Sequence, residues 1–547
     1  MLTSHQSQQY TPQFLKEKIE YLKKLELEKV KTYMDIAIYG YNTYNYPIAE
    51  KYISKVEEIV GDDNIDVLLN KIKIHVLIQP HKIEKDLDKL EDLINKFCEG
   101  DMDIINRQMN RDKNMCNIYR KNLAYVKGLY YFSTGNYKLA HQTFESDDVA
   151  SLIYKEISRY IIDKDKVDFK KYRINSRILN DFNFFLQVVN TLKTHALYDE
   201  EYNYIKRNRK NYEKNRDIKF IIDLYVNDIY REKGLGKKGY ENSKRMYNEK
   251  PSDENVIKNL HCFANGVGDF ETFWKLERTF NRNIVNAIVG HNIEPFNDLV
   301  DSMDGKKILL VTDQGFGDNF MNFRYIKEFV DKHPNTEFYF MIYPELIDLF
   351  KRNIPNRVKT IEYNISMEKF DSYKLDRYIY VSRIPMIMDV RIEDIKELDR
   401  KTIFEIDNPI EYDRDTIGIV WKTNIRSIDT RHRSYELEDF LNKIDIDSLK
   451  KKYSIISLQK DVTEHEKEIL DRHNIEILDN KLTSFYESAR YIKNLKELYT
   501  IDTGIMHLGG VMKVPIMMYL NKFRDCKWSN SEFDNNHFLY QDLKISQ

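Results

Sequence analysis

Residues 306–325 read KKILLVTDQGFGDNFMNFRY, and this stretch sets the fold class of the C-terminal half. Its first part, which ends at Thr312, is a continuous apolar run, as expected of a strand buried in a parallel sheet. Gly315 and Gly317 then permit a tight turn and the close approach of a ligand to the backbone. The apolar spacing of residues 318–330 predicts a helix. The stretch therefore predicts one strand-turn-helix unit of an α/β fold.

Further strand-and-helix units follow the first. The apolar runs that predict strands are 337–343, 378–381, 416–421, 453–458, 474–478, 497–501 and 515–520. Helical patterns fall between most of them, and such alternation indicates parallel sheets with right-handed crossovers. The units form two sets that divide near Pro409, which predicts two α/β lobes that face a cleft. Ligands of such sheets lie beyond the carboxyl ends of the strands.

The N-terminal half has a different character. Residues 81–250 contain no proline, which favours helix. Residues 123–144 (LAYVKGLYYFSTGNYKLAHQTF) resemble one tetratricopeptide repeat, a helix-turn-helix unit of about 34 residues. Gly128 is expected where the two helices pack closely, and Gly135 in the turn. The inner face of the second helix is expected to consist of Tyr137, Ala140 and Phe144.

Weaker echoes of this pattern occur at residues 46–52 and 264–276. One repeat cannot bury its own apolar face, so several copies would have to stack. An irregular helical domain with one accidental match is the alternative interpretation.

Composition limits the classes of protein. The chain has 547 residues, enough for about three or four domains. Lys+Arg is 86 and Asp+Glu is 88, for a formal net charge of -2, which argues against a protein that coats polyanions. Hydrophobic residues make up 42%, which excludes disorder throughout.

Cysteines and apolar runs bear on the compartment. The spacing of Cys98, Cys116, Cys262 and Cys526 matches no zinc or disulfide pattern, which predicts unpaired thiols in a reducing compartment. Residues 1–10 have no signal-peptide core, and no apolar run approaches the ~20 residues of a membrane span. We therefore expect a soluble, cytoplasmic protein without a membrane span.

Segments that follow predicted strands carry groups for chemistry. Asp318 begins a helix, where it is either an N-cap or a carboxylate base directed into the cleft. Residues 502–510 (DTGIMHLGG) open another helix, whose free N–H groups and dipole favour a phosphate. Thr503 and His507 lie near that end. A capped helix with a packed histidine is the alternative.

Two basic segments have a functional and a plain interpretation. Residues 421–424 (WKTN) and 431–434 (RHRS) place cations beyond a strand end, which suits a pyrophosphate leaving group; a solvated charged loop is the alternative. The basic run 206–219, with tyrosines nearby, is compatible with nucleic-acid contact but is more typical of the wet face of a helix.

Five segments occur in the order found in a known family. They are QGFGDNFMNFRY (314–325), GIVWKTN (418–424), RHRS (431–434), SLQK (457–460) and DTGIMHLGGVMKVP (502–515). Together they resemble the catalytic region of bacterial tetratricopeptide-repeat glycosyltransferases, which are relatives of the heptosyltransferases of glycosyltransferase family 9. GDFETFW (268–274) is similar to the last repeat before that region.

The resemblance implies a GT-B architecture. An α helical-repeat half (residues 1–290) would precede an α/β half of two Rossmann-like lobes with parallel sheets. The first lobe (300–408) would take the acceptor and the second (409–547) the nucleotide sugar. The first lobe is short, and the tryptophan and proline signals usual near its start are missing.

The resemblance also implies roles for individual residues. The aspartate of the family's Gly-Asp pair acts as a base, which maps to Asp318, and Gln314, Gly315 and Gly317 would line the acceptor side. The Asp-Thr-Gly and the histidine of the family's last motif bind the donor diphosphate and map to Asp502, Thr503, Gly504 and His507. Lys422 is a looser match to the family's lysine, and Arg433 and Gln459 complete the predicted donor-binding set. No metal and no cofactor is expected, because the nucleotide sugar is a substrate.

The sequence therefore predicts an inverting, metal-independent glycosyltransferase of hexosyl- or heptosyltransferase type. The helical half would recruit a protein, glycan or modified-nucleic-acid acceptor, and an oligomer is compatible with this organisation. The alternative is a non-catalytic helical-repeat scaffold with a degenerate nucleotide-sugar-binding lobe. A sugar transferase acting on modified DNA bases is a third hypothesis, supported only by the basic run 206–219.

Overall fold

The computed structural model describes most of the chain. The described residues are 12–42, 46–76, 79–101, 103–104, 115–145, 148–172, 176–279, 293–312, 315–400, 403–423, 432–522, 524–529 and 537–546. Gln314 and Arg431 of the predicted site lie outside them. The chain divides into two compact units, one comprising residues 1–211 with 424–431 and the other 212–423 with 432–547.

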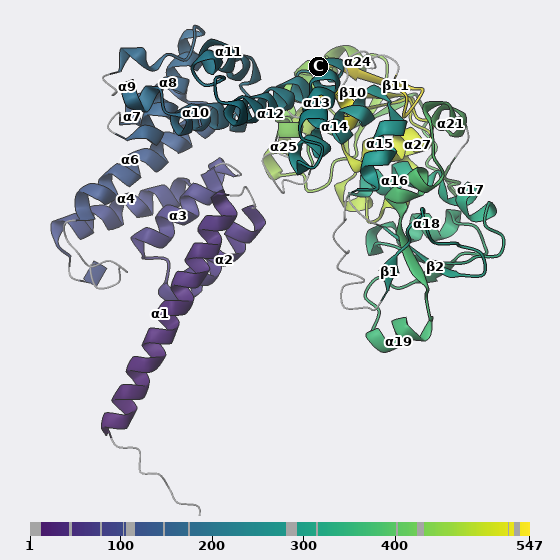
Figure 1. Cartoon of the computed structure of the whole chain (residues 1–547), viewed down its shortest axis with the longest axis horizontal. Coiled ribbons are helices and arrows are strands. Elements are labelled where there is room, and N and C mark those ends of the chain that lie inside the picture. Colours follow the sequence, from purple (N-terminus) through teal and green to yellow (C-terminus); the bar gives the residue numbers. More distant parts are fainter. Residues whose placement is uncertain are drawn as a thin grey trace, which may run out of the picture. The chain divides into compact units, whose positions relative to one another are not determined.

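Helices build the described part of the first unit, and neighbours along the chain pack on one another, as α1 and α2 or α6 and α7 do (Figure 1). The α-helices are α1 (Pro12–Asn42), α2 (Tyr46–Val60), α3 (Ile65–Val76), α4 (Glu84–Glu99), α6 (Cys116–Ser133), α7 (Tyr137–Thr143), α8 (Val149–Asp163), α9 (Ser176–Leu179), α10 (Phe182–Thr194) and α11 (Tyr198–Asn208). Short 3-10 helices are η1 (Pro80–Lys82), η3 (Phe169–Lys171) and η4 (Arg209–Asn211).

The predicted helical hairpin at residues 123–144 is present as α6 and α7. A Cβ atom at Gly128 would lie 2.5 Å from the ring of Phe144, so only glycine fits there. Gly135 turns the chain with a φ of 81°, and Asn136 caps the second helix. Ala140 is fully buried. These contacts confirm the hairpin, whereas its identity as a tetratricopeptide repeat stays a prediction.

The described part of the second unit begins with four more helices, of which the first two lie in the proline-free stretch 81–250 and confirm the helical character expected there. They are α12 (Arg216–Glu232), α13 (Gly236–Glu249), α14 (Glu254–Val267) and α15 (Phe270–Glu277). The hairpin of α14 and α15 repeats the design of α6 and α7. Gly268 turns the chain with a φ of 77°, and the Asp269 carboxylate accepts a hydrogen bond from the N–H of Thr272.

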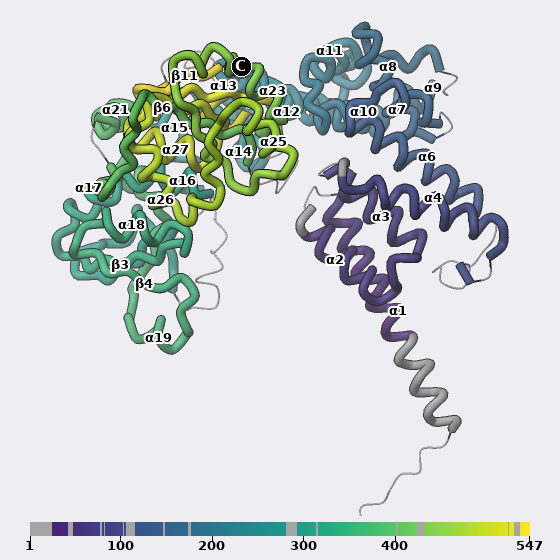
Figure 2. The backbone as a smooth tube through the Cα atoms, turned by 180° about the vertical axis from the view of Figure 1, so that it is seen from behind, coloured from purple at the N-terminus to yellow at the C-terminus, as the bar shows by residue number. Residues whose placement is uncertain are grey.

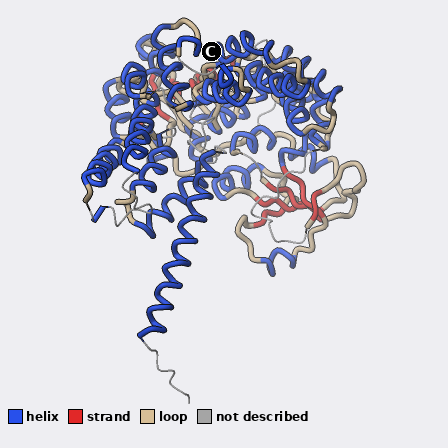
Figure 3. The backbone as a smooth tube through the Cα atoms, turned by 60° about the vertical axis from the view of Figure 1, so that its left-hand side comes forward, coloured by secondary structure: helices blue, strands red, loops and turns tan. Residues whose placement is uncertain are grey.

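A five-stranded parallel sheet follows, with the strand order β1-β5-β2-β3-β4 (red in Figure 3). Its strands are β1 (Glu294–Pro295), β2 (Lys307–Val311), β3 (Glu337–Met341), β4 (Lys359–Ile361) and β5 (Arg377–Tyr380). The helices of this segment are α16 (Phe316–Phe323), α17 (Ile326–Asp331), η6 (Pro344–Leu346), α18 (Ile347–Asn353), α19 (Met367–Ser372), η7 (Val381–Arg383), α20 (Ile384–Ile387) and α21 (Ile392–Leu398).

A six-stranded parallel sheet completes the unit, with the order β11-β10-β9-β6-β7-β8. Its strands are β6 (Thr416–Ile419), β7 (Ser454–Ser457), β8 (Glu476–Ile477), β9 (Glu497–Thr500), β10 (Ile516–Tyr519) and β11 (Leu543–Ser546). The helices are α23 (Leu437–Lys443), α24 (Ile446–Lys450), α25 (Glu464–Arg472), η8 (Asp479–Lys481), α26 (Phe485–Ile492), α27 (Gly504–Val511) and η9 (Cys526–Trp528).

The two parallel sheets confirm the α/β character expected of the C-terminal half. One apolar core extends from Phe270 and Trp274 of α15 through Phe320 of α16 to Met506 and Leu508 of α27. The last helical hairpin is therefore part of the same packed body as the sheets. The GT-B lobes and their boundaries at residues 290–300 and 408–409 stay predictions.

The expectation of four unpaired thiols is wrong. Cys98 is bonded to Cys116, and Cys262 of α14 is bonded to Cys526 of η9. The two cysteines of the second pair are 264 residues apart in sequence, and no spacing pattern predicts a disulfide over such a separation. Disulfides are typical of oxidising compartments, so they remove one support of the cytoplasmic prediction. Among the described residues, no helix has the length and apolar character needed to span a membrane.

The basic run 206–219 spans the end of α11, η4 and the start of α12. Arg207 pairs with Glu200 at 2.5 Å. Of the three nearby tyrosines, Tyr204 and Tyr212 are buried and Tyr202 is half-buried, so they do not present a row of rings for stacking on bases. This arrangement favours the interpretation of the run as a solvated surface.

Candidate functional site

The candidate site forms where α16 meets α27, two helices that lie side by side and follow strands of different sheets (Figures 1 and 2). A Cβ atom at Gly317 would lie 2.5 Å from the ring of His507, and one at Gly504 would lie 3.5 Å from Phe316. Gly317 thus makes room for the histidine. The helix contact brings the predicted acceptor-side loop against the predicted donor-binding loop.

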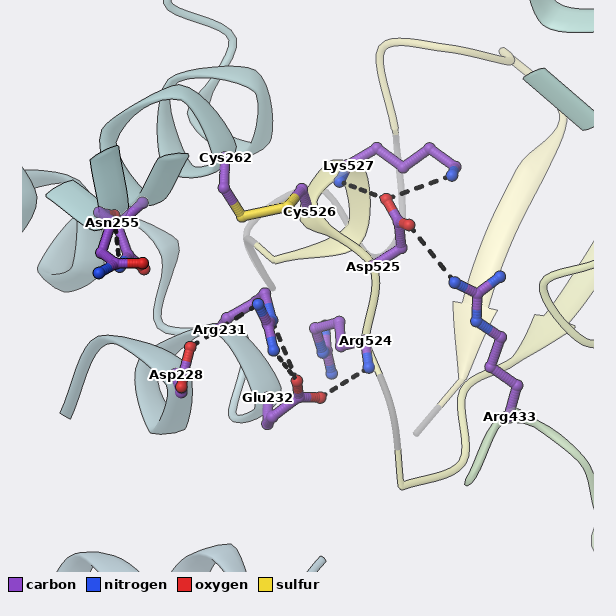
Figure 4. Close-up of a disulfide and its surroundings, with 11 residues drawn as sticks. Asp228, Arg231, Glu232, Asn255, Cys262, Arg433, Arg524, Asp525, Cys526 and Lys527 are labelled. Atoms are coloured by element: carbon purple, nitrogen blue, oxygen red, sulfur yellow. Dashed lines mark hydrogen bonds and ion pairs between the residues drawn. A yellow bond between two sulfur atoms is a disulfide. The ribbon is translucent and has the colours of Figure 1, made fainter. Parts of the chain in front are cut away.

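A cluster of opposite charges lies beside this contact. Arg433 is 3.4 Å from an Asp502 carboxylate oxygen and 3.5 Å from an Asp525 oxygen. Lys527 reaches Asp525 at 3.2 Å and Asp318 at 4.0 Å. Figure 4 shows Asp525 between the two cations. The cluster thus connects Asp318 to Asp502 through charged side chains.

Burial makes the charges of the cluster interdependent. Lys527 has a side chain only 9% exposed; burial lowers its pKa, but Asp525, Asp502 and Asp318 outweigh that effect and raise the pKa above its ordinary value. Burial opposes ionisation of Asp502 as well, yet Lys527, His507 and Arg433 hold the pKa of that carboxyl below its usual range. Both groups are therefore charged at neutral pH.

Asp318 is one of the two partly exposed carboxylates of the cluster, with Asp525. It is the third residue of α16, with a side chain 29% exposed. One oxygen accepts a long hydrogen bond, 3.4 Å, from the N–H of Gly315, which is the capping contact expected of a helix start. Its other described partner is Lys527. Asp318 therefore serves as a weak cap and still presents a carboxylate at the surface of the site.

His507 and Thr503 make the structural contacts of a capped helix with a packed histidine. The Thr503 hydroxyl accepts a hydrogen bond from the N–H of Met506 at 3.3 Å. His507 is 2% exposed, and its Nδ1 lies 2.9 Å from the Tyr540 hydroxyl. Burial lowers the pKa of His507 despite the nearby Asp502. The imidazole is therefore neutral at neutral pH.

Lys422 and Gln459 lie apart from this cluster. The Gln459 side-chain oxygen accepts hydrogen bonds from the N–H groups of Trp421 and Lys422 at 3.3 and 3.0 Å. The Lys422 ammonium pairs with Glu466 at 2.5 Å. Within the described residues, no hydrogen bond or ion pair joins Lys422 or Gln459 to Asp502. Their donor-binding roles stay predictions.

Sequence reasoning missed Asp525, Lys527 and Tyr540. The first two follow β10, which is the neighbour of β9 in the sheet, so they emerge at the same edge as Asp502. The rule that ligands lie beyond the carboxyl ends of parallel strands was the available signal. The strand that ends at residue 520 carries this signal as the strand that ends at residue 501 does, but no glycine or known motif follows residue 520.

His537 fixes the backbone of Lys527. Its Nδ1 accepts a hydrogen bond from the N–H of Leu539 at 3.2 Å, so Nε2 carries the proton and donates to the carbonyl oxygen of Lys527 at 2.8 Å. Burial lowers the pKa of His537 to about 3. The neutral ring is thus a positioning group for Lys527.

We expect acid to destabilise the protein through His537. Between its ordinary pKa of 6.5 and its folded pKa of about 3, the unfolded chain binds a proton that the folded chain does not. The free energy of unfolding should therefore fall as pH falls below 6.5, by roughly 2 kcal/mol at pH 5. Urea unfolding at pH 7 and 5 tests this, with His537→Gln as the comparison. Equal pH dependence in both proteins would contradict it.

The segment that carries Lys527 is held to the helices of the same unit (Figure 4). Cys526 is bonded to Cys262 of α14, and a Cβ atom at Gly266 would come 2.8 Å from the Cys526 carbonyl oxygen. The Glu232 carboxylate of α12 accepts a hydrogen bond from the N–H of Arg524 at 2.7 Å. The position of Lys527 therefore depends on α12 and α14.

Removing this disulfide should affect the site as well as stability. We expect Cys262→Ser/Cys526→Ser to lower the free energy of unfolding by about 2–4 kcal/mol and to weaken the nucleotide binding that the sequence predicts for this site, because η9 loses its link to α14. Cys98→Ser/Cys116→Ser is the matched control, since that disulfide lies in the first unit. It should leave nucleotide binding unchanged. Equal nucleotide affinities in the two double variants would refute the prediction.

No protein-family model matches the sequence, and no curated protein matches it. Solved structures that share a likeness include a glycosyl transferase family 9 protein from Veillonella parvula (TM-score 0.30, 12% identity, 40% of this chain and 81% of that one). Others are the E. coli ADP-heptose LPS heptosyltransferase II (0.30, 11%, 44% and 90%) and a Thermobaculum terrenum O-GlcNAc transferase mutant (0.25, 9%, 76% and 87%). Likenesses this low carry no argument about activity.

Among the described residues, no three His, Cys, Asp or Glu side chains converge as possible ligands of a metal ion. The metal-free mechanism stays a prediction. The geometry brings the partly exposed Asp318 carboxylate, two cations and the N-terminus of α27 into one cluster.

Proposed function

We propose that the chain is a glycosyltransferase that moves a sugar from a nucleotide sugar to an acceptor hydroxyl, with inversion and without a metal. The observation that carries the proposal is the apposition of Asp318 with the Lys527–Asp525–Arg433–Asp502 cluster at the start of α27. A base and a cationic leaving-group site are the two elements such a transfer requires.

In the proposed reaction, Asp318 takes the proton from the acceptor hydroxyl. The acceptor oxygen attacks the anomeric carbon, and the bond from that carbon to the diphosphate oxygen breaks. The nucleoside diphosphate leaves with the electron pair. Its charge is stabilised by Lys527, Arg433 and the free N–H groups at the N-terminus of α27. Attack opposite to the leaving group inverts the anomeric centre.

Asp502 has a supporting role in this proposal. Its carboxylate is 5% exposed and faces Arg433 and His507, so it orients those groups and is shielded from substrate. Lys422 and Gln459 would join the donor site only after leaving their present partners. The cytoplasmic location, the oligomeric state and the identity of the acceptor are further predictions of the same proposal.

A helical-repeat scaffold with a degenerate nucleotide-sugar-binding lobe is the second candidate. The observation that favours it is that several predicted donor ligands already make contacts that stabilise the fold. Thr503 caps α27, His507 packs against Tyr540, and Lys422 pairs with Glu466. In this case the charged cluster would only hold the fold together.

Calorimetric titration with UDP, GDP, ADP and CMP, and with their sugar conjugates, separates the two candidates. We expect saturable binding of one nucleotide, weakened at least tenfold by Arg433→Gln. Arg472→Gln on α25 is the control, because Arg472 is 64% exposed and pairs only with Glu438 among the described residues. The absence of binding across the panel would favour the scaffold.

A further inference from the structure

A cavity of about 210 Å³ adjoins the proposed site. The hairpin of α14 and α15 forms one wall, and α16, η7 and α20 contribute to the others. Asp318 and Lys527 both line it, so a ligand in the cavity is in reach of the proposed base. All of these elements belong to the second unit.

Aromatic side chains of α15 form much of the apolar lining. Phe273 stacks on His261 with ring centres 4.2 Å apart. The Trp274 indole N–H donates to the carbonyl oxygen of Val390 at 2.8 Å. The indole nitrogen of Trp274 therefore already has a hydrogen-bond partner in the protein. What Trp274 offers to a ligand in the cavity is ring carbon. A ligand here needs an apolar face that packs on aromatic carbon.

Three carboxylates belong to the polar lining, together with the neutral side chains of Asn265, Asn322, Tyr325 and Ser382. Asp318, Asp525 and Glu277 all border the cavity. Glu277 is only 2% exposed, and its carboxylate lies 2.8 Å from Nε2 of His261. Ionised carboxylates accept hydrogen bonds and cannot donate them. A matching ligand therefore brings several O–H donors, more than the single hydroxyl of a serine or threonine side chain.

The charge and the volume of the cavity restrict further the kinds of ligand that fit it. The lining has three carboxylates and two basic side chains, Lys527 and His261, which both lie against those carboxylates. A ligand that lies wholly in the cavity, unlike the diphosphate that Lys527, Arg433 and α27 together would hold, is therefore expected to be uncharged. Pockets for drug-sized molecules are roughly 300–1,000 Å³, larger than this cavity. One compact ring fits these limits better than an extended chain does.

We propose that this cavity is the acceptor subsite of the proposed transferase and takes one uncharged sugar residue of a glycan. The sugar ring places its C–H face on the Phe273 and Trp274 side and directs hydroxyls to Glu277 and Asp318. The hydroxyl nearest Asp318 is the one that receives the donor sugar. This inference rests on the proposed function, because Asp318 serves as the base in both.

Direct binding of simple glycosides tests the subsite without any donor. The full chain is titrated with methyl glucoside, galactoside and mannoside, and with a serine- and threonine-containing peptide, using saturation-transfer NMR. Asn265→Trp places an indole in the cavity from α14, and Glu277→Gln removes one charge without changing shape. Asn255→Trp is the matched control, because Asn255 is exposed on the same helix.

We expect at least one glycoside to bind, with affinity reduced at least tenfold in Asn265→Trp, reduced in Glu277→Gln and unchanged in Asn255→Trp. Absence of glycoside binding, unchanged binding in Asn265→Trp, or preference for the peptide would overturn the subsite. The nucleotide titration is read separately. Nucleotide binding without glycoside binding refutes the subsite alone, and glycoside binding without nucleotide binding refutes the proposed function alone.

Discussion

Replacing Asp318 by asparagine is expected to lower turnover by about 10²–10⁴-fold, the usual contribution of a positioned base. Asparagine has nearly the same shape, and its side-chain oxygen keeps the hydrogen bond from the N–H of Gly315. It cannot take a proton from the acceptor. Nucleotide affinity and the free energy of unfolding should change little, because Asp525 and Asp502 still balance the charge of Lys527 when the Asp318 charge is lost.

The measurement is steady-state transfer with the nucleotide sugar identified by titration, together with the affinity for its nucleoside diphosphate. Asp331→Asn is the matched control, since Asp331 ends α17 on the exposed surface. A variant with normal turnover would leave Asp318 as a helix cap only. A variant with weakened nucleotide affinity as well would place Asp318 in donor binding.

The strand pattern could be predicted from sequence where strands are long and buried. β2 and β3 carry continuous apolar runs, and both were predicted. β1, β4 and β11 were not. β1 is a two-residue strand with both side chains exposed, and β4 has three residues, of which one is buried. Both are too short to leave a periodic apolar signal, and β1 gains its place from pairing with the distant β5.

The candidate site could be predicted in part for a similar reason. Asp318 follows a parallel strand of one sheet, and Asp502 and His507 follow a parallel strand of the other. The packing of α16 on α27 brings these two strand ends together. Lys422 follows such a strand too, yet it pairs with Glu466 of α25. A sequence gives the place of a charged residue along the chain but not which partner it takes.

Partners that meet through chain segments far apart are the hardest to foresee. Lys527 borders Asp318, which precedes it by more than two hundred positions, and its neighbour Cys526 is bonded to Cys262 of the helical region. Tertiary packing alone creates these contacts. The helical hairpin of α14 and α15 was recognised as a repeat-like unit, whereas its part in the cavity beside Asp318 became visible only in the fold.

Replacing Lys527 by methionine is expected to give the largest loss of stability among the substitutions at the site. The ammonium lies among Asp525, Asp502 and Asp318, and removal of one partner from a buried ion pair typically lowers the free energy of unfolding by about 3–5 kcal/mol. Nucleotide affinity should fall too, because the cluster loses one of its two cations.

Acid should partly rescue this variant. Without Lys527, the remaining carboxylates repel one another, and this repulsion raises their pKa values. At pH 7 they are all ionised and the repulsion is greatest. Partial protonation near pH 5 reduces the repulsion and so stabilises the folded variant. Urea unfolding at pH 7 and pH 5 measures the difference in the free energy of unfolding between wild type and Lys527→Met. This difference should become smaller as pH falls. Lys467→Met is the control, because its partner Glu464 is 87% exposed and such surface pairs contribute about 0–1 kcal/mol. If Lys527→Met were as stable as the control at pH 7, the buried cluster would not be the electrostatic centre of the site.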